Sequence, residues 1–167
     1  MQVIDDFLPS YLFKELQSLM MGDEFPWYYN DNIVYDDNGL YQLTHMIFNI
    51  REGGICSTCY SWFDIVQQKL GVGHLDRIKS NLNPKTVFHR KGGYHFDNTP
   101  SDPYQHTKTA VLYINTNNGW THIKKGGKVK SVENRIVIFD SDLEHTGVTC
   151  TDEKRRVVIN FNYDSYL

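Results

Sequence analysis

The sequence predicts a mainly β protein, a sandwich or a barrel, with helices confined to its N-terminal part. From residue 76 onward, short segments rich in β-forming residues recur at even spacing, with turn residues between them. Two earlier segments have the apolar periodicity of helices instead. At 167 residues, we expect a single domain over 1–167, with N-terminal support over 1–74 and a β core over 75–167.

The N-terminal part is expected to contain a short strand and two helices. Residues 3–7 read as the strand. A helix follows over 10–20, since its apolar residues form one stripe and Pro9 lacks an N–H that the first turn would leave unpaired. A second helix is expected over 60–70, where glycines end it.

Extended pieces complete the predicted fold. Residues 33–35 and 42–50 flank a turn at 36–39, because Asp-Asp-Asn-Gly favours a tight reversal. The β core should then consist of seven strands, predicted at 76–82, 107–115, 120–124, 128–132, 136–139, 145–149 and 156–163.

Charge and composition exclude several classes of protein. The formal net charge is −3, and the short basic run 124–128 contains Gly-Gly, so it reads as a hairpin turn and not as a nucleic-acid patch. No apolar stretch reaches the roughly 20 residues that span a bilayer, and the acidic start is no signal peptide. We therefore expect no membrane or clear nucleic-acid partner and a cytoplasmic location.

The cysteines give no sign of a disulfide framework, because there are only three of them. Cys56 and Cys59 have C-x-x-C spacing, but a zinc site needs a second pair of ligands and the sequence has no other such pair. We interpret both as structural.

Two histidines and one aspartate form the main functional signal. His95 and Asp97 occupy alternate positions after a glycine loop, so on a strand both would point to one face. His145 follows a later apolar strand and a polar turn. Two imidazoles and one carboxylate are the ligands of the facial triad in non-haem Fe(II) oxygenases. His74 and Asp76 have the same spacing, but they follow a helix end and are interpreted as structural.

The last predicted strand begins with two arginines that suit a dicarboxylate cosubstrate. A 2-oxo acid that chelates iron through its keto acid end needs a cation at its far carboxylate, and arginine binds carboxylates with two hydrogen bonds. Arg156 shares a face with polar residues, whereas Arg155 shares one with apolar residues, so we favour Arg156 and keep Arg155 as the alternative. Tyr113 is a further candidate donor to that carboxylate.

Together these residues resemble the 2-oxoglutarate/Fe(II) dioxygenases, and most of all the prolyl-4-hydroxylase-like branch with its small phage-encoded members. The resemblance covers about residues 75–163 and includes the segments 112–115 and 118–121. It implies a double-stranded β-helix (jelly roll) with N-terminal helices packed on the larger sheet. It also implies Fe(II) bound by His95, Asp97 and His145, and 2-oxoglutarate bound by a basic residue of the last strand with Tyr113.

The sequence also differs from the family pattern at some positions. Residues 118–121 read Asn-Gly-Trp-Thr where the family often has Gly-Gly-x-Thr, and the arginine pair stands where collagen-type members use lysine. The presence of Asp97 argues against the halogenase variant, which lacks this carboxylate.

The predicted function is hydroxylation by Fe(II), O2 and 2-oxoglutarate. The substrate stays open, since a prolyl peptide, an amino acid, a nucleobase and a small metabolite all fit the sequence. One alternative is a non-catalytic β-sandwich, such as a virion-associated binding module with a coincidental or vestigial triad. The other is a cupin-like metalloenzyme, which the arginine pair disfavours because such sites need no cation there.

Overall fold

A large antiparallel sheet forms the frame of this computed structural model, which describes residues 1–31, 33, 39–98 and 105–166. Its strand order is β1-β9-β6-β11-β5-β3-β2, and β4 pairs with β3. These strands are β1 (Gln2–Ile4), β2 (Tyr28–Asn30), β3 (Gln42–Asn49), β4 (Gly54–Ile55), β5 (Val72–Pro84), β6 (Lys108–Tyr113), β9 (Ile136–Asp140) and β11 (Arg155–Ser165). The long strands β5 and β11 are paired along their whole length and lie near its centre.

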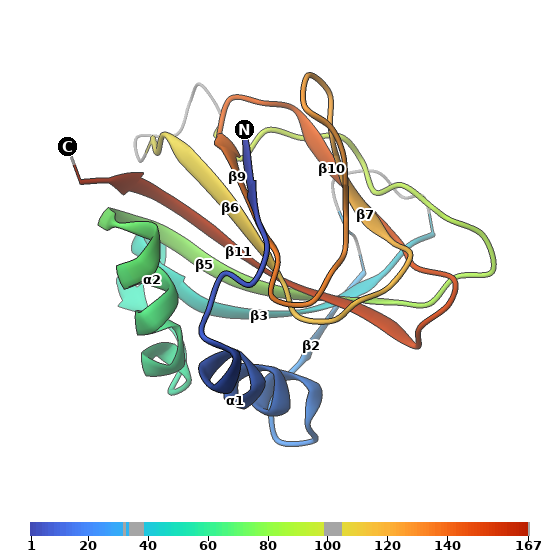
Figure 1. The fold of residues 1–167 in the computed structure, drawn as a ribbon, viewed down its shortest axis with the longest axis horizontal. Coiled ribbons are helices and arrows are strands. Elements are labelled where there is room, and N and C mark those ends of the chain that lie inside the picture. Colours follow the sequence, from blue (N-terminus) through green and yellow to red (C-terminus); the bar gives the residue numbers. More distant parts are fainter. Residues whose placement is uncertain (32, 34–38, 99–104, 167) are drawn as a thin grey trace.

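A smaller sheet lies across from the large one (Figure 1). Its order is β10-β7-β8, formed by β7 (Trp120–Ile123), β8 (Gly127–Lys130) and β10 (His145–Val148). Isolated bridges at Lys91↔Val148 and His95↔His145 add the segment 91–95 beside β10. Two opposed antiparallel sheets of this kind form the jelly roll that the resemblance implied.

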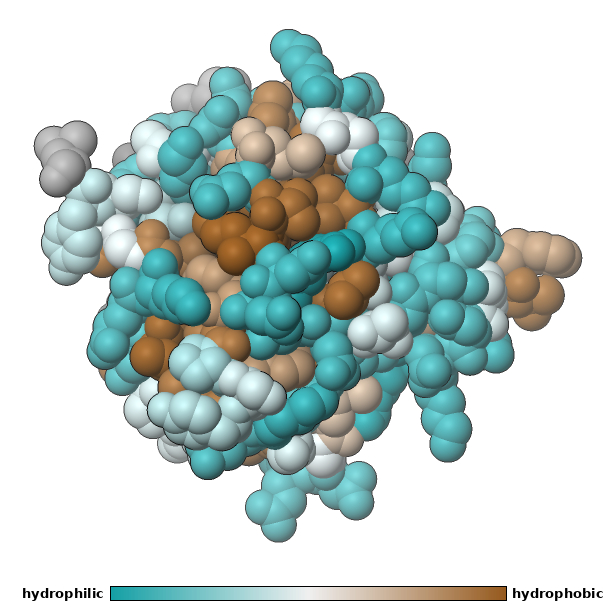
Figure 2. Space-filling model, viewed as in Figure 1, coloured by the Kyte–Doolittle hydropathy of each residue, from teal (hydrophilic) through white to brown (hydrophobic). Residues whose placement is uncertain are grey.

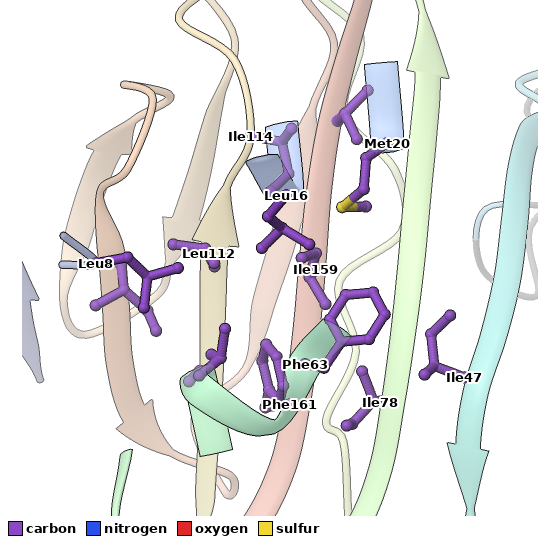
Figure 3. Packing of buried hydrophobic residues seen from close by; sticks show 14 of the residues in the cluster. Leu8, Leu16, Met20, Ile47, Phe63, Ile78, Leu112, Ile114, Ile159 and Phe161 are labelled. Carbon is purple, nitrogen blue, oxygen red and sulfur yellow. The ribbon is translucent and has the colours of Figure 1, made fainter. Parts of the chain in front are cut away.

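The helices pack on the outer face of the large sheet (Figure 1). These are α1 (Ser10–Met21) and α2 (Asp64–Leu70), the second preceded by the 3-10 turn η2 (Tyr60–Phe63); another such turn, η1 (Ile50–Glu52), follows β3. Side chains from both helical segments interlock with those of the sheet, as Figure 3 shows for Leu16, Met20, Phe63, Ile159 and Phe161. This core lies on the outer side of the large sheet, so the polar pocket residues of β5 and β11 lie on its concave face.

A second apolar cluster lies on the inner side, away from the helices. It joins Val111 and Tyr113 of β6 to Ile123 of β7 and Val129 of β8, with Phe139 of β9 beside them. Because both sheets contribute, this cluster fixes the small sheet against one half of the large one.

Most expected elements are present, with shifts of one to four residues at their ends. Helix 10–20 and the segment 60–70 match α1 and η2–α2, and the glycine-rich run 124–128 is the β7–β8 turn. The turn expected at 36–39 lies outside the described residues except for Gly39. β2 was not predicted as a strand.

One local prediction was wrong. His95 and Asp97 were expected at alternate positions of a strand, but this segment belongs to no strand and makes a single bridge at His95. Phe96 is 51% exposed. The glycines before it and the proline after it do not favour a continuous ladder.

The surface seen in Figure 2 is largely hydrophilic, with apolar residues gathered around the start of the chain, where Met1 and Val3 are exposed. Within the part of the chain that the structure describes, no helix has the length and apolar character needed to cross a bilayer.

Candidate functional site

The structure brings together the three residues that the sequence singled out as metal ligands. One ligand atom from each of His95, Asp97 and His145 lies within 4.8 Å of the others. The Nε2 atoms of both histidines lie 3.8 Å from the Asp97 carboxylate. Backbone hydrogen bonds of 3.0 Å in both directions between His95 and His145 fix the two rings side by side.

Backbone carbonyls orient both imidazoles. Nδ1 of His95 lies 3.3 Å from the Gly93 carbonyl, and Nδ1 of His145 lies 3.0 Å from the Leu143 carbonyl. A carbonyl can only accept, so each Nδ1 carries the proton and each Nε2 presents a lone pair towards Asp97. Burial and the neighbouring His145 lower the pKa of His95, which favours the neutral ring that a metal requires.

Three side chains hold the Asp97 carboxylate. Arg77 donates to Oδ1 at 3.2 Å, while Thr109 and Asn162 donate to Oδ2 at 2.7 and 2.8 Å. Burial alone would raise the pKa of Asp97, but Arg77, His145 and the Thr109 hydrogen bond outweigh it and keep this pKa well below its usual range. The group is therefore an anion in a fixed orientation. Its donor set, with the two Nε2 atoms, fits Fe(II).

Arg156 is a buried cation on the concave face of the large sheet. It is only 2% exposed. Its Nε donates to the Ser131 hydroxyl at 2.9 Å and its Nη2 to the Thr121 hydroxyl at 3.0 Å. Among the described residues it forms no ion pair with a carboxylate. A buried charge held only by neutral groups is costly unless an anion joins it.

The other two predicted cosubstrate ligands are placed differently. Tyr113 lies beneath Arg156, whose Cζ is 5.6 Å from the ring centroid, and its hydroxyl donates to Thr121 at 2.8 Å. Arg155 points towards α1, where its guanidinium donates to the Met21 carbonyl. The structure thus brings Tyr113 next to Arg156 and separates Arg155 from both.

One pocket of about 790 Å³ contains both the triad and Arg156. Its floor is the concave face of β5 and β11, where cross-strand pairs place Asn160 opposite Lys79 and Asn162 opposite Arg77. A cation and a cluster of metal-ligand types in one pocket are suited to a small anion that reaches from one to the other.

Several supporting residues were missed at the sequence level. Thr121 and Ser131 hold Arg156, and Thr109, Asn162 and Arg77 hold Asp97. The available signal was alternation: Asn162 lies on the same face of the last strand as Arg156, and Thr109 shares its strand face with Tyr113.

Solved structures support the same fold. No protein-family model and no curated protein matches the sequence. A prolyl-4-hydroxylase from Pseudomonas putida superposes with a TM-score of 0.67 at 17% identity, covering 99% of this chain and 92% of the other. The viral collagen prolyl hydroxylase of Paramecium bursaria Chlorella virus-1 gives 0.63 at 14% identity, covering 96% and 93%. A 2OG-Fe(II) oxygenase family protein from Burkholderia pseudomallei gives 0.72 at 12% identity, covering 96% and 83%.

The chain therefore has the fold of the 2-oxoglutarate/Fe(II) oxygenases. Two of these structures are prolyl hydroxylases, so the fold resembles that of the branch that the sequence motifs indicated.

Proposed function

We propose that this protein is a 2-oxoglutarate- and Fe(II)-dependent hydroxylase. The observation that carries the proposal is the buried Arg156, which lacks a carboxylate partner among the described residues and lines the same pocket as His95, Asp97 and His145. A dicarboxylate with one end at the metal would supply the missing anion.

In this proposal, His95, Asp97 and His145 hold Fe(II). Bound iron with a 2-oxo acid supplies the oxidation of a C–H bond by O2, coupled to decarboxylation of the 2-oxo acid. The Gly93 and Leu143 carbonyls keep both imidazoles in the ligating tautomer, and the hydrogen bonds to Asp97 keep its carboxylate ionised.

The remaining part of the site would position the cosubstrate. Arg156 binds the distal carboxylate of 2-oxoglutarate, and the Thr121 and Ser131 hydroxyls keep the guanidinium in place. The Tyr113 ring lies next to the Arg156 guanidinium, and both side chains donate a hydrogen bond to the Thr121 hydroxyl. Since Arg155 is held at the Met21 carbonyl, Arg156 is the cosubstrate residue in this proposal.

The test is an anaerobic titration of the Fe(II)-loaded protein with 2-oxoglutarate, followed through the visible metal-to-ligand charge-transfer band. We expect the band in the wild type, its loss in His145→Ala, and a higher 2-oxoglutarate requirement in Arg156→Ala. Arg155→Ala is the matched control and should bind 2-oxoglutarate like the wild type. A folded wild type that retains no metal and gives no band would favour the non-catalytic binding module instead.

A further inference from the structure

The pocket contains a second cation that the proposed function does not use. Lys79 of β5 lines the pocket, and its side chain points to the same face as Arg77 and Asn81. Among the described residues, the ammonium group forms no ion pair or hydrogen bond. Burial and the neighbouring Arg77 lower the pKa of Lys79, and the opposing effect of Asp97 does not outweigh them.

The other charges of the pocket are already matched. Arg51 pairs with Asp76 at 3.0 Å, and Arg77 pairs with Asp97 at 3.2 Å. Of the described charged side chains that line the pocket, only Lys79 and Arg156 remain without a carboxylate. The charges of Fe(II) and doubly ionised 2-oxoglutarate offset each other, so the loaded pocket would stay positive.

The cosubstrate would not satisfy Lys79. Its distal carboxylate is assigned to Arg156 and its keto acid end to the metal, which leaves Lys79 available to a further ligand. Lys79 lies two positions from Arg77, about 7 Å along the strand, and Arg77 contacts the Asp97 carboxylate. An anion at Lys79 would therefore lie close to the metal cluster.

A neighbouring acceptor supports this subsite. The side-chain oxygen of Asn81 is buried and has no hydrogen-bond partner. Asn81 lines the same pocket two positions from Lys79. Buried polar atoms without partners are rare, so an N–H or O–H group of a ligand is a natural complement.

We propose that Lys79 and Asn81 form a substrate subsite, and that the substrate carries a carboxylate or phosphate group bound by Lys79. The inference rests on the proposed function, since it identifies the chemical class of that enzyme's substrate. It favours an acidic, hydrogen-bonding molecule over a neutral apolar one.

Sulfate is the probe, because it has two negative charges and coordinates Fe(II) weakly. Sulfate is titrated by anaerobic calorimetry into the Fe(II)- and 2-oxoglutarate-loaded protein. Binding should weaken about tenfold or more in Lys79→Met, because truncation of one partner of a buried charge pair has an effect of at least this size. Lys79→Arg should retain binding. Lys130→Met, which removes an exposed strand lysine, is the matched control and should bind sulfate like the wild type.

The charge-transfer band separates this proposal from the one on which it rests. The band should form in Lys79→Met at the same 2-oxoglutarate concentration as in the wild type. Equal sulfate affinity in the wild type and Lys79→Met would overturn the subsite, and so would competition between sulfate and 2-oxoglutarate. A wild type that gives no band but binds sulfate through Lys79 would contradict the oxygenase proposal and support the anion site. If Lys79→Met does not fold, Lys79→Gln takes its place.

A second arm compares substrates of matched shape. Consumption of 2-oxoglutarate is measured with two pairs of amino acids, glutamate against glutamine and aspartate against asparagine. Each amino acid is tested in its free form and, separately, as part of an N-acetylated, C-amidated dipeptide. Stimulation by an acidic member, lost in Lys79→Met, would support the proposal. Stimulation by a neutral member alone would overturn it.

Discussion

Asn162 on the last strand donates a hydrogen bond of 2.8 Å to the carboxylate of Asp97. Asp97 comes from a segment outside the regular strands, so its orientation depends on such contacts from the sheet. Thr109 of β6 contributes a second bond to the same oxygen at 2.7 Å, and Asn162 also donates to Thr109 at 3.0 Å. The three residues form a closed network.

Removal of this network should weaken metal binding. Thr109→Val preserves side-chain shape but removes one donor to Asp97, so we expect Fe(II) affinity to fall about 10- to 100-fold, the usual effect of losing a partner of a metal ligand. The affinity is measured by competition with a chelator. Thr107→Val, which changes an exposed threonine two positions earlier, should bind Fe(II) like the wild type. Equal affinities in both variants would contradict a role for the network.

Arg156→Met should separate stability from ligand binding. The substitution removes a buried cation that has only neutral partners, so the ligand-free variant should unfold at the same or a higher temperature than the wild type. At the same time, added 2-oxoglutarate should no longer raise the unfolding temperature of the Fe(II)-loaded protein.

Arg155→Met should behave in the opposite way. It loses the contact to the Met21 carbonyl and should be less stable by about 1 kcal/mol, yet it should keep the thermal shift with 2-oxoglutarate. Identical shifts in the two arginine variants would argue against the assignment of Arg156.

Gly119→Ala should displace Arg156 without removing it. A Cβ at Gly119 would lie 2.8 Å from Cδ of Arg156 and equally close to the Val148 carbonyl oxygen, whereas a Cβ at Gly147 would meet the guanidinium at an ordinary 3.5 Å. We expect a larger loss of 2-oxoglutarate affinity in Gly119→Ala than in Gly147→Ala. The charge-transfer titration measures both, and the reverse order would count against this geometry.

Asp76 should make the free energy of unfolding vary with pH in the acidic range. Burial would raise its pKa, but the His106 ring, whose Nδ1 lies 3.4 Å from the carboxylate, and the hydrogen bonds from Arg51 outweigh burial and lower it from 3.8. Because the unfolded chain then binds protons more readily, the contribution of Asp76 is present above the unfolded pKa and is lost as pH falls through the lower folded pKa.

Asp76→Asn should therefore cost about 2–4 kcal/mol at neutral pH, and the difference from the wild type should shrink below about pH 4. Urea unfolding across that range measures it. Asp23→Asn, at an exposed position, is the control for removing a carboxylate. A difference that does not change with pH would show that the Asp76 ion pair is not its cause.

Phe63 should contribute strongly to the packing of the helices on the large sheet, and so to the free energy of unfolding. It is fully buried, and its ring centroid lies 6.5 Å from that of Phe161 in the sheet. Phe63→Ala should lower the free energy of unfolding by about 3–5 kcal/mol. The adjacent Trp62 is 44% exposed, so Trp62→Ala should have a clearly smaller effect in chemical denaturation.

The sequence predicted the structure well in segments where the alternation of apolar and polar residues matches which side chains are buried. Alternation along the last strand placed Val157, Ile159 and Phe161 in the core and Arg156 on the opposite face, and the structure has this arrangement. The even spacing of short strands likewise predicted the β architecture. In these segments each residue's environment follows from its neighbours in the chain.

The ligand segment was less predictable for a physical reason. Residues 91–97 are held by one bridge at each end of the glycine loop and by side-chain contacts to distant strands, so no local periodicity reveals their conformation. The roles of Thr121, Ser131 and Lys79 depend on which strands become neighbours. That is a property of the sheet order and not of any short motif.

The last strand has a consequence for how this scaffold can change. Arg156 and Asn162 stand six positions apart on β11, so their backbone positions lie about 20 Å apart along the strand and one element carries both the buried cation and a residue that holds Asp97. A single inserted residue between them would reverse the facing of one relative to the other, so Arg156 and Asn162 could no longer both point into the pocket. β11 must therefore keep the spacing of these two residues, whereas the pocket residues of β3 and β5 can change without altering that spacing.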